Sequence, residues 1–219
     1  MDDPIWRQAI KDEQHPLYRA AWQLFSPSFD ARYSAETLAS QKDEVIAFAN
    51  ILLDSPELYE DSSLGSGNAP LNAAELLGEW QVTETIQRLV QTIEAGDVDS
   101  DLFDLATMAL HKMGIAVVEP LLDAASRATD DEVPFVVAEI LGEAGKGDSR
   151  ALDFLKKMFD EQYEYYDTLD IAESLLACNP QAGTSFIENR LQHRHYDKET
   201  RKTLQSYLQE ARKGEFNDL

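Results

Sequence analysis

The chain contains a single cysteine and no long apolar run. With Cys178 alone, an intramolecular disulfide framework is excluded, and a reducing compartment such as the cytoplasm is predicted. No segment approaches the roughly 18–20 apolar residues that a membrane span needs. The acidic opening from Met1 to Pro4 has the features of neither a secretory nor an organellar leader. We therefore expect a cytoplasmic protein that does not contact a membrane.

Basic residues are scarce. The chain has 19 Lys and Arg against 41 Asp and Glu, which gives a formal net charge of −22 at pH 7. Nucleic acids bind through many Lys and Arg contacts to phosphates, and anionic membrane surfaces also attract basic segments, so neither partner is expected. Such a charge keeps a protein soluble, and it also attracts a basic partner.

One region reverses this balance. Within residues 188–213 the basic side chains outnumber the acidic ones: Arg190, Arg194, Lys198, Arg201, Lys202, Arg212 and Lys213 against Glu188, Asp197, Glu199 and Glu210. The far end of the chain is therefore locally basic on an acidic protein.

Motifs for metal binding or catalysis are also missing. Asp97 to Asp101 begins like a calcium loop, but Leu102 and Met108 occupy the positions where that loop needs Gly and Glu. Carboxylate pairs one helical turn apart, Glu75/Glu79 and Glu139/Glu143, could bind metal or act as acid and base, yet their recurrence favours solvated faces of equivalent helices. We predict no metal, no cofactor and no catalytic residue, and hence no enzyme.

Helical periodicity is the strongest positive signal. In residues 130–159, two apolar stripes are separated by a short polar joint; they consist of Val133, Val137, Ile140, Leu141 and Ala144, and of Ala151, Leu155, Met158 and Phe159. This pattern predicts a helix, a turn and a second helix. One such pair cannot bury both stripes alone, so it needs neighbours of the same kind.

The chain supplies those neighbours as repeats. The segment Ala74 to Glu79 recurs as Ala138 to Glu143, and aligning Leu77, Leu110, Leu141 and Leu175 gives steps of 33, 31 and 34 residues. Second helices are predicted over residues 84–95, 115–128, 151–162 and 183–191, with a last helix over 197–212. We expect Thr83 to cap the first of these, and left-handed residues to end helices at Gly96, Gly114, Gly145 and Asn179.

The first part of the chain is less regular. We predict an N-terminal helical cap over residues 1–60, which includes a helix over 35–53. A Gly/Ser-rich connector follows, and then a repeat array with a C-terminal capping helix over 69–219; all of these form one continuous structural unit in this prediction. Aromatic residues open the cap: Trp6, Tyr18, Trp22 and Phe25. Packing over the first repeat explains them, and a ligand cleft is the alternative.

The paired helices, the period in the thirties and the small-x-x-Leu-Gly core of the first helix resemble HEAT-like repeats. The closest segments are Pro70–Gly78 and Val118–Leu122, and they resemble short bacterial HEAT-repeat proteins. The resemblance covers about residues 69–195. It implies an all-α, right-handed α-solenoid, a superhelix of helix pairs with atypical helical caps.

This resemblance also implies functions. Most such arrays are protein-interaction scaffolds, and a minority are pigment-attachment lyases, hydroxylases or DNA-repair enzymes. The His-Glu dipeptides of the di-iron hydroxylases are missing, and the acidic stretch 69–170 does not suit a DNA-repair groove. We predict a scaffold or adaptor that binds a protein or peptide, with a basic one favoured. The alternative is a HEAT-like lyase or chaperone that handles a chromophore or small ligand.

The resemblance places the binding face on the second helix of each pair. The predicted face comprises Gln87, Gln91, Glu119, Asp123, Lys156, Lys157 and Asp160, and Tyr163 and Tyr166 join it as aromatic anchors beside acids. For the tyrosines, packing between helix pairs is the competing interpretation.

Overall fold

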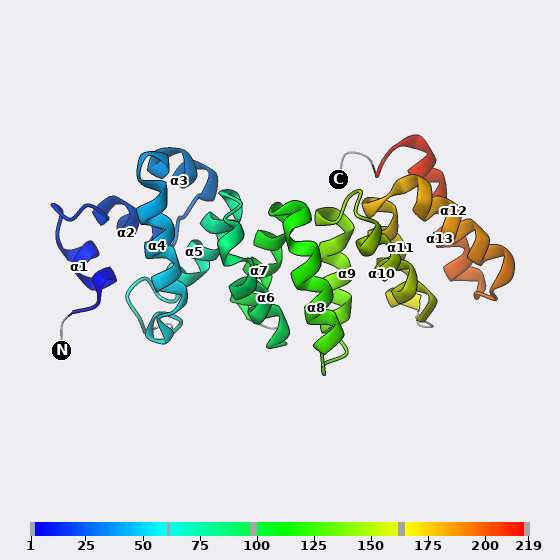
Figure 1. The fold of residues 1–219 in the computed structure, drawn as a ribbon, viewed down its shortest axis with the longest axis horizontal. Helices are drawn as coiled ribbons and strands as arrows, with labels where there is room; N and C mark the ends of the chain where they lie inside the picture. The colour runs from blue at the N-terminus through cyan, green and yellow to red at the C-terminus, as the bar shows by residue number, and fades with distance from the viewer. Residues whose placement is uncertain (1–2, 61, 97–99, 162–164, 217–219) are drawn as a thin grey trace. The chain divides into compact units, whose positions relative to one another are not determined.

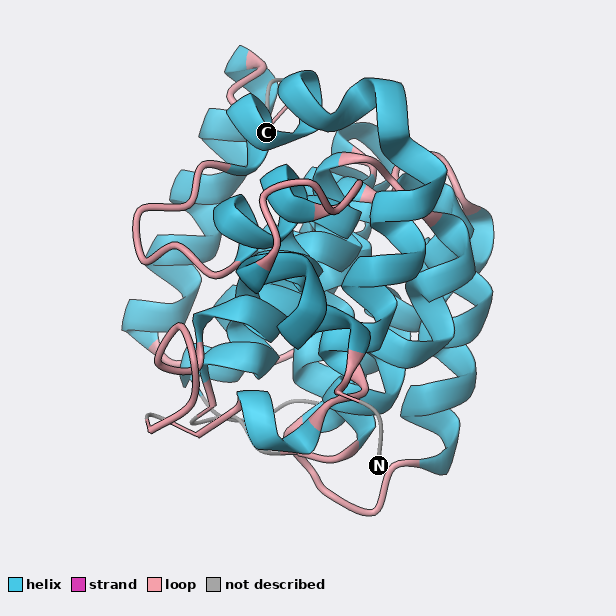
Figure 2. Cartoon of the chain, turned by 90° about the vertical axis from the view of Figure 1, so that its left-hand side faces the viewer, coloured by secondary structure: helices cyan, strands magenta, loops and turns pink. Residues whose placement is uncertain are grey.

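The computed structural model describes residues 3–60, 62–96, 100–161 and 165–216 (Figure 1). Within these ranges the chain forms α-helices and short 3-10 turns joined by loops, and it contains no strand (Figure 2). The prediction of an all-α protein is confirmed. The α-helices are α1 (Ile5–Lys11), α2 (Tyr18–Leu24), α3 (Ala31–Leu38), α4 (Lys42–Leu53), α5 (Asn68–Glu79), α6 (Ile86–Glu94), α7 (Asp101–Lys112), α8 (Val118–Arg127), α9 (Val133–Ala144), α10 (Ser149–Glu161), α11 (Tyr165–Cys178), α12 (Pro180–His193) and α13 (Lys198–Lys213).

The chain divides into two compact units. Unit 1 contains residues 1–92 and 97–112, and unit 2 contains residues 93–96 and 113–219. In unit 1, α5 is central, because α2, α3, α4 and α7 all pack against it. In unit 2, α11 contacts α9, α10, α12 and α13, while α8 packs on α9. Each unit therefore buries its apolar stripes around one central helix.

The repeated leucines form the core, as their spacing predicts. Leu77, Leu110, Leu141 and Leu175 are each fully buried. In the same register, a Cβ atom added to Gly78 would lie 2.6 Å from the Ala109 Cα atom, and one added to Gly142 would lie 2.9 Å from the Ser174 Cα atom. The recurring glycine thus has one physical role in both units, because it lets α5 lie directly against α7 and α9 directly against α11.

Packing on α5 changes one predicted helix. The helix expected over residues 35–53 is interrupted by a 3-10 turn at Ala39–Gln41, which separates α3 from α4. Both of these helices contact α5. The interruption redirects the chain so that each of them packs there. No proline or glycine marks the position, so local sequence could not predict it.

Three predicted helix ends also differ. Thr83 does not cap α6; it opens a 3-10 turn, Thr83–Thr85, which precedes the helix. Gly96 and Gly114 are left-handed as expected, but Gly145 has a φ of −86°. Asn179, at a φ of −155°, begins α12 instead of ending α11, and its Oδ1 accepts a hydrogen bond from the Ala182 N–H at 3.0 Å. Pro180 explains this, since a residue before proline is disfavoured in the helical region.

Candidate functional site

An aromatic hollow lies on unit 1 at the turn between α2 and α3. Asp30 shapes this turn, because its Oδ1 accepts a hydrogen bond from the Tyr33 N–H at 2.8 Å and so begins α3. The side chains of Trp22 and Tyr33 remain 61% and 57% exposed. Exposed apolar patches of this kind mark interaction sites. The hollow has a volume of about 440 Å³ and is lined by Arg19, Trp22, Gln23, Ser26, Ser28, Phe29, Asp30, Tyr33 and Ser34.

Two amide side chains support the aromatic hollow. Asn72 is buried on α5, and its Nδ2 donates hydrogen bonds to the carbonyl oxygens of Leu24 and Ser26, both at 2.9 Å. These bonds fasten the turn to the core. Gln23 donates from Nε2 to Thr37 Oγ1 at 3.1 Å, whereas its buried Oε1 has no hydrogen-bond partner in the described structure. An unsatisfied buried acceptor costs stability, and a ligand N–H could relieve that cost.

The other N-terminal aromatic residues serve packing. Trp6 and Phe25 are buried, and their ring centroids lie 6.0 Å apart. Both rings therefore belong to the core of unit 1, and the cap over a first repeat stays a prediction. Trp22 differs because its side chain faces solvent at the aromatic hollow. The alternative prediction of a ligand cleft therefore concerns this residue.

An acidic hollow adjoins the aromatic one. It has a volume of about 560 Å³ and is lined by Phe29, Asp30, Ala31, Arg32, Tyr33, Glu36, Glu75, Glu79 and Lys112. Lys112 is already paired with Glu79, at 2.8 Å. The carboxylates of Glu36 and Glu75 have no ion-pair or hydrogen-bond partner within the residues described. The two hollows share Phe29, Asp30 and Tyr33, so exposed aromatic rings lie beside unpaired negative charge.

The two recurring carboxylate pairs occupy different surroundings. Glu139 and Glu143 on α9 are exposed, as expected of a solvated face. Glu75 and Glu79 on α5 are half-buried and line the acidic hollow. Equivalent positions in the repeat therefore do not have equivalent roles, because α3 and the preceding turn cover only the pair in unit 1.

The predicted binding face is divided between the units. Gln87 and Gln91 are exposed on α6 in unit 1, and Asp123 is exposed on α8 in unit 2. Lys156 and Lys157 pair within α10, with Asp153 at 3.6 Å and Glu161 at 3.8 Å. Tyr163 lies outside the described residues, as do the side chain of Tyr166 and the predicted calcium-loop positions Asp97 and Asp99. None of these residues lines a hollow described here, and their binding role stays a prediction.

Glu119 and Asp160, from the same predicted face, belong to a ladder of ion pairs among residues of unit 2. Asp160 on α10 binds Arg190 on α12 through two bonds, of 2.5 and 2.6 Å. The four rungs are Glu94–Arg127, Glu119–Arg150, Asp160–Arg190 and Glu188–Arg212. Sequence reasoning missed the ladder. Its signal is a carboxylate followed by an arginine after 33, 31, 30 and 24 residues.

Arg150 in the ladder also orders the turn before α10. Its side chain bonds to Asp148 at 2.7 Å, and these hydrogen bonds, with the backbone N–H groups of Arg150 and Ala151, lower the pKa of Asp148 to about 2. This carboxylate therefore remains ionised at all ordinary pH values. Its role is to hold the start of α10, where a negative charge is also favoured by the helix dipole.

Cys178 is buried, as expected of a small core residue. Its Sγ lies 3.4 Å from the carbonyl oxygen of Gly145, and burial raises the pKa of the thiol to about 11. Such a thiol is a poor nucleophile. The described residues contain no group of His, Cys, Asp and Glu arranged to hold a metal ion. Among the helices of the same residues, none is both long and apolar enough to cross a membrane.

Comparisons with known protein families, with curated proteins and with solved structures found no match.

Proposed function

We propose that the chain is a protein-binding adaptor, which holds a peptide segment on the adjoining aromatic and acidic hollows of unit 1. One observation carries the proposal: exposed Trp22 and Tyr33 stand beside the unpaired carboxylates of Glu36 and Glu75. The matching segment has an aromatic or aliphatic residue next to Lys or Arg. The apolar residue would pack on the rings, and the cation would neutralise the carboxylates.

The resemblance to HEAT-like repeats supports this function. We infer that the helix pairs form a right-handed α-solenoid and that the adaptor works in the cytoplasm, where a lone thiol stays reduced. The equivalent contacts of Gly78 and Gly142 support a repeated helix-pair unit. The net charge of −22 would speed encounter with a basic partner.

Selection of peptides from a random displayed library on the immobilised full chain tests the proposal. We expect the selected peptides to combine Lys or Arg with an adjacent aromatic residue. A Trp22→Ala, Tyr33→Ala double variant should lose them, and Glu75→Gln should weaken binding and reduce its dependence on salt. Glu139→Gln is the matched control, since it changes the equivalent exposed position of α9. Selected peptides that are acidic, or that still bind the double variant, would contradict the proposal.

A second candidate function is the handling of a small planar ligand. The partnerless Oε1 of Gln23 favours it, because a flat molecule stacked on Trp22 could donate a hydrogen bond to that oxygen. Gln23→Leu would then abolish ligand binding, whereas it should leave binding of the basic peptides nearly unchanged.

A further inference from the structure

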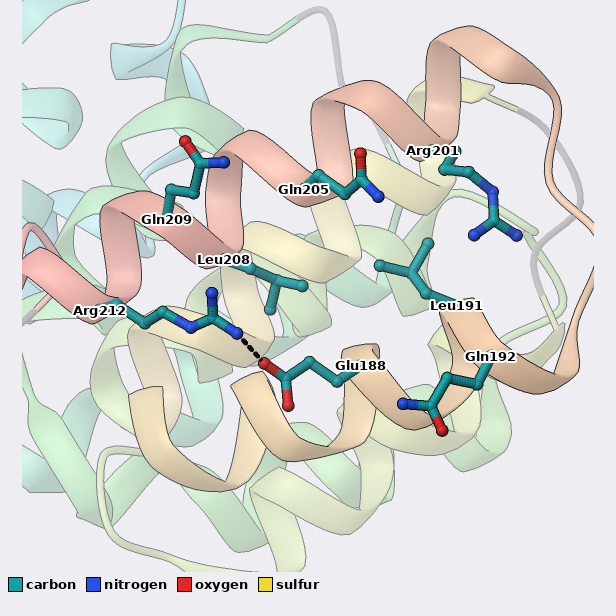
Figure 3. Close-up of a pocket in the computed structure, with 8 residues that line it drawn as sticks. All are labelled: Glu188, Leu191, Gln192, Arg201, Gln205, Leu208, Gln209 and Arg212. Carbon is teal, nitrogen blue, oxygen red and sulfur yellow. Dashed lines mark hydrogen bonds and ion pairs between the residues drawn. The ribbon is translucent and has the colours of Figure 1, made fainter.

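A groove in unit 2 lies between α12 and α13 (Figure 3). It has a volume of about 660 Å³, in the range of ligand sites. Leu191 and Leu208 point toward each other across its floor, and Arg201 extends from α13 into the gap. The groove therefore combines an apolar floor with a cationic wall.

Arg201 distinguishes this groove. Four other arginines of unit 2 belong to the ion-pair ladder, and Arg194 donates to the backbone carbonyl oxygen of Asp160 at 3.0 Å. Arg201 is half-buried as a residue, and its guanidinium has neither a hydrogen bond nor an ion pair within the described part of the chain. A partly desolvated guanidinium favours two parallel bonds to a carboxylate. A carboxylate is thus the partner that Arg201 lacks.

Local charge agrees with an acidic ligand. Arg212 is neutralised by Glu188 at one end of the groove, so Arg201 carries the unpaired positive charge of the groove lining. Lys198 and Lys202 are exposed on the same helix as Arg201. The rest of the protein is strongly acidic, but exposed charges beyond about 8 Å are largely screened at physiological salt. The groove itself lies within residues 188–213, where Lys and Arg outnumber Asp and Glu.

Glutamine side chains extend the site along α13. Gln205 and Gln209 follow Arg201 at successive intervals of four residues and line the rim of the groove. Four residues of helix rise about 6 Å. Two residues of an extended peptide span roughly 6.6 Å, so every second peptide group can lie opposite one residue of this row. Each glutamine amide offers both a donor and an acceptor to a peptide backbone.

We propose that this groove binds an extended acidic peptide segment. An Asp or Glu carboxylate pairs with Arg201, and the peptide backbone bonds to Gln205 and Gln209. An aliphatic side chain contacts the small part of Leu191 and Leu208 that the fold leaves exposed. The preferred ligand has a charge opposite to that of the ligand proposed for unit 1. The chain thus carries two peptide sites of different specificity.

Fluorescence anisotropy on the full chain tests this proposal with a labelled peptide of alternating Glu and Leu, compared with alternating Gln and Leu and alternating Lys and Leu. We expect the Glu–Leu peptide to bind the groove and the Gln–Leu peptide not to bind. The Lys–Leu peptide suits the unit 1 hollows instead, so any binding of it should be unchanged in Arg201→Gln and lost in the Trp22→Ala, Tyr33→Ala variant. Arg201→Gln should weaken it at least tenfold, and Arg201→Lys should weaken it less. Lys202→Gln is the matched control, because it removes an exposed charge one position away and should change affinity less than twofold. Gln205→Ala with Gln209→Ala should weaken binding without changing its salt dependence.

Several outcomes would overturn the proposal. They are no binding of the Glu–Leu peptide, equal binding of it to the Arg201→Gln variant, or Lys–Leu binding that the Arg201→Gln substitution removes. Tighter binding of inorganic phosphate or single-stranded DNA, lost in Arg201→Gln, would show a phosphate site instead. Salt-sensitive self-association removed by the same substitution would make the occupant a second copy. The Trp22→Ala, Tyr33→Ala variant should retain Glu–Leu binding, which separates this test from that of the unit 1 site.

Discussion

Replacement of Gly78 by alanine tests the packing that organises unit 1. The new Cβ atom would lie 2.6 Å from the Cα atom and 2.7 Å from the Cβ atom of Ala109, and no rotamer change can remove a Cα atom. Overpacking of this kind costs about 1–3 kcal/mol, and a backbone contact favours the upper end. Alanine regains about 1 kcal/mol of helix propensity, so we expect a net loss of about 2 kcal/mol.

The chain contains its own probes for this measurement. All three tryptophans, Trp6, Trp22 and Trp80, lie in unit 1, and the single cysteine, Cys178, lies in unit 2. Thermal unfolding followed by tryptophan fluorescence should show a midpoint lowered by about 4–8 °C, because 1 kcal/mol corresponds to about 2–4 °C in a chain of this size.

Gly142→Ala gives the matched comparison in unit 2. Its Cβ atom would lie 2.9 Å from the Ser174 Cα atom, so the expected loss is smaller. Labelling of the Cys178 thiol, which is buried in the native protein and becomes accessible on unfolding, would report it. Stabilisation of the Gly78→Ala variant by about 1 kcal/mol, the value for an unconstrained helix position, would refute the close approach of α5 and α7.

Two further predictions concern unit 2. Cys178 should react with a thiol reagent at pH 8 only after unfolding in urea, because the thiol is buried and its pKa is raised to about 11; rapid reaction of the native protein would contradict this. Burial and then the charge of Asp167 raise the pKa of Asp170, so the native state binds this proton more tightly than the unfolded state and loses stability as the pH rises through the raised pKa. Asp170→Asn should therefore raise the unfolding midpoint at pH 7, and this increase should become smaller in acid. An increase of the same size at every pH would exclude the charge of Asp170 as its cause.

The sequence predicted most where the signal was local and periodic. Leu77, Leu110, Leu141 and Leu175 were aligned by spacing alone, and all four are buried. Asn179 shows how the same reasoning fails: an asparagine after a helix suggests a left-handed end, but the following Pro180 makes it the start of α12. The information was present in the sequence, yet two local preferences competed and the proline constraint prevailed.

The candidate sites were less predictable. Glu119 and Asp160 were expected on an open binding face, but they pair with Arg150 and Arg190 from the next helix. The sequence predicts packing or a ligand cleft for Trp22 and a solvated face for Glu75, and no pattern marks Tyr33. In the structure these residues line the hollows of unit 1. The sequence around each of these residues does not show which side chain another helix will place beside it.

Sequence alone determined that this chain is helical, which faces of its helices are apolar, and where a glycine must recur. These properties follow from 3.6-residue periodicity and from the size of single side chains, which act within one helix. The tertiary structure decided which charges are paired, which aromatic rings remain exposed, and why Arg201 stands without a carboxylate. Those outcomes depend on which side chains packing brings together from helices that are distant in the chain, as it does for Asp160 and Arg190, which are 30 residues apart.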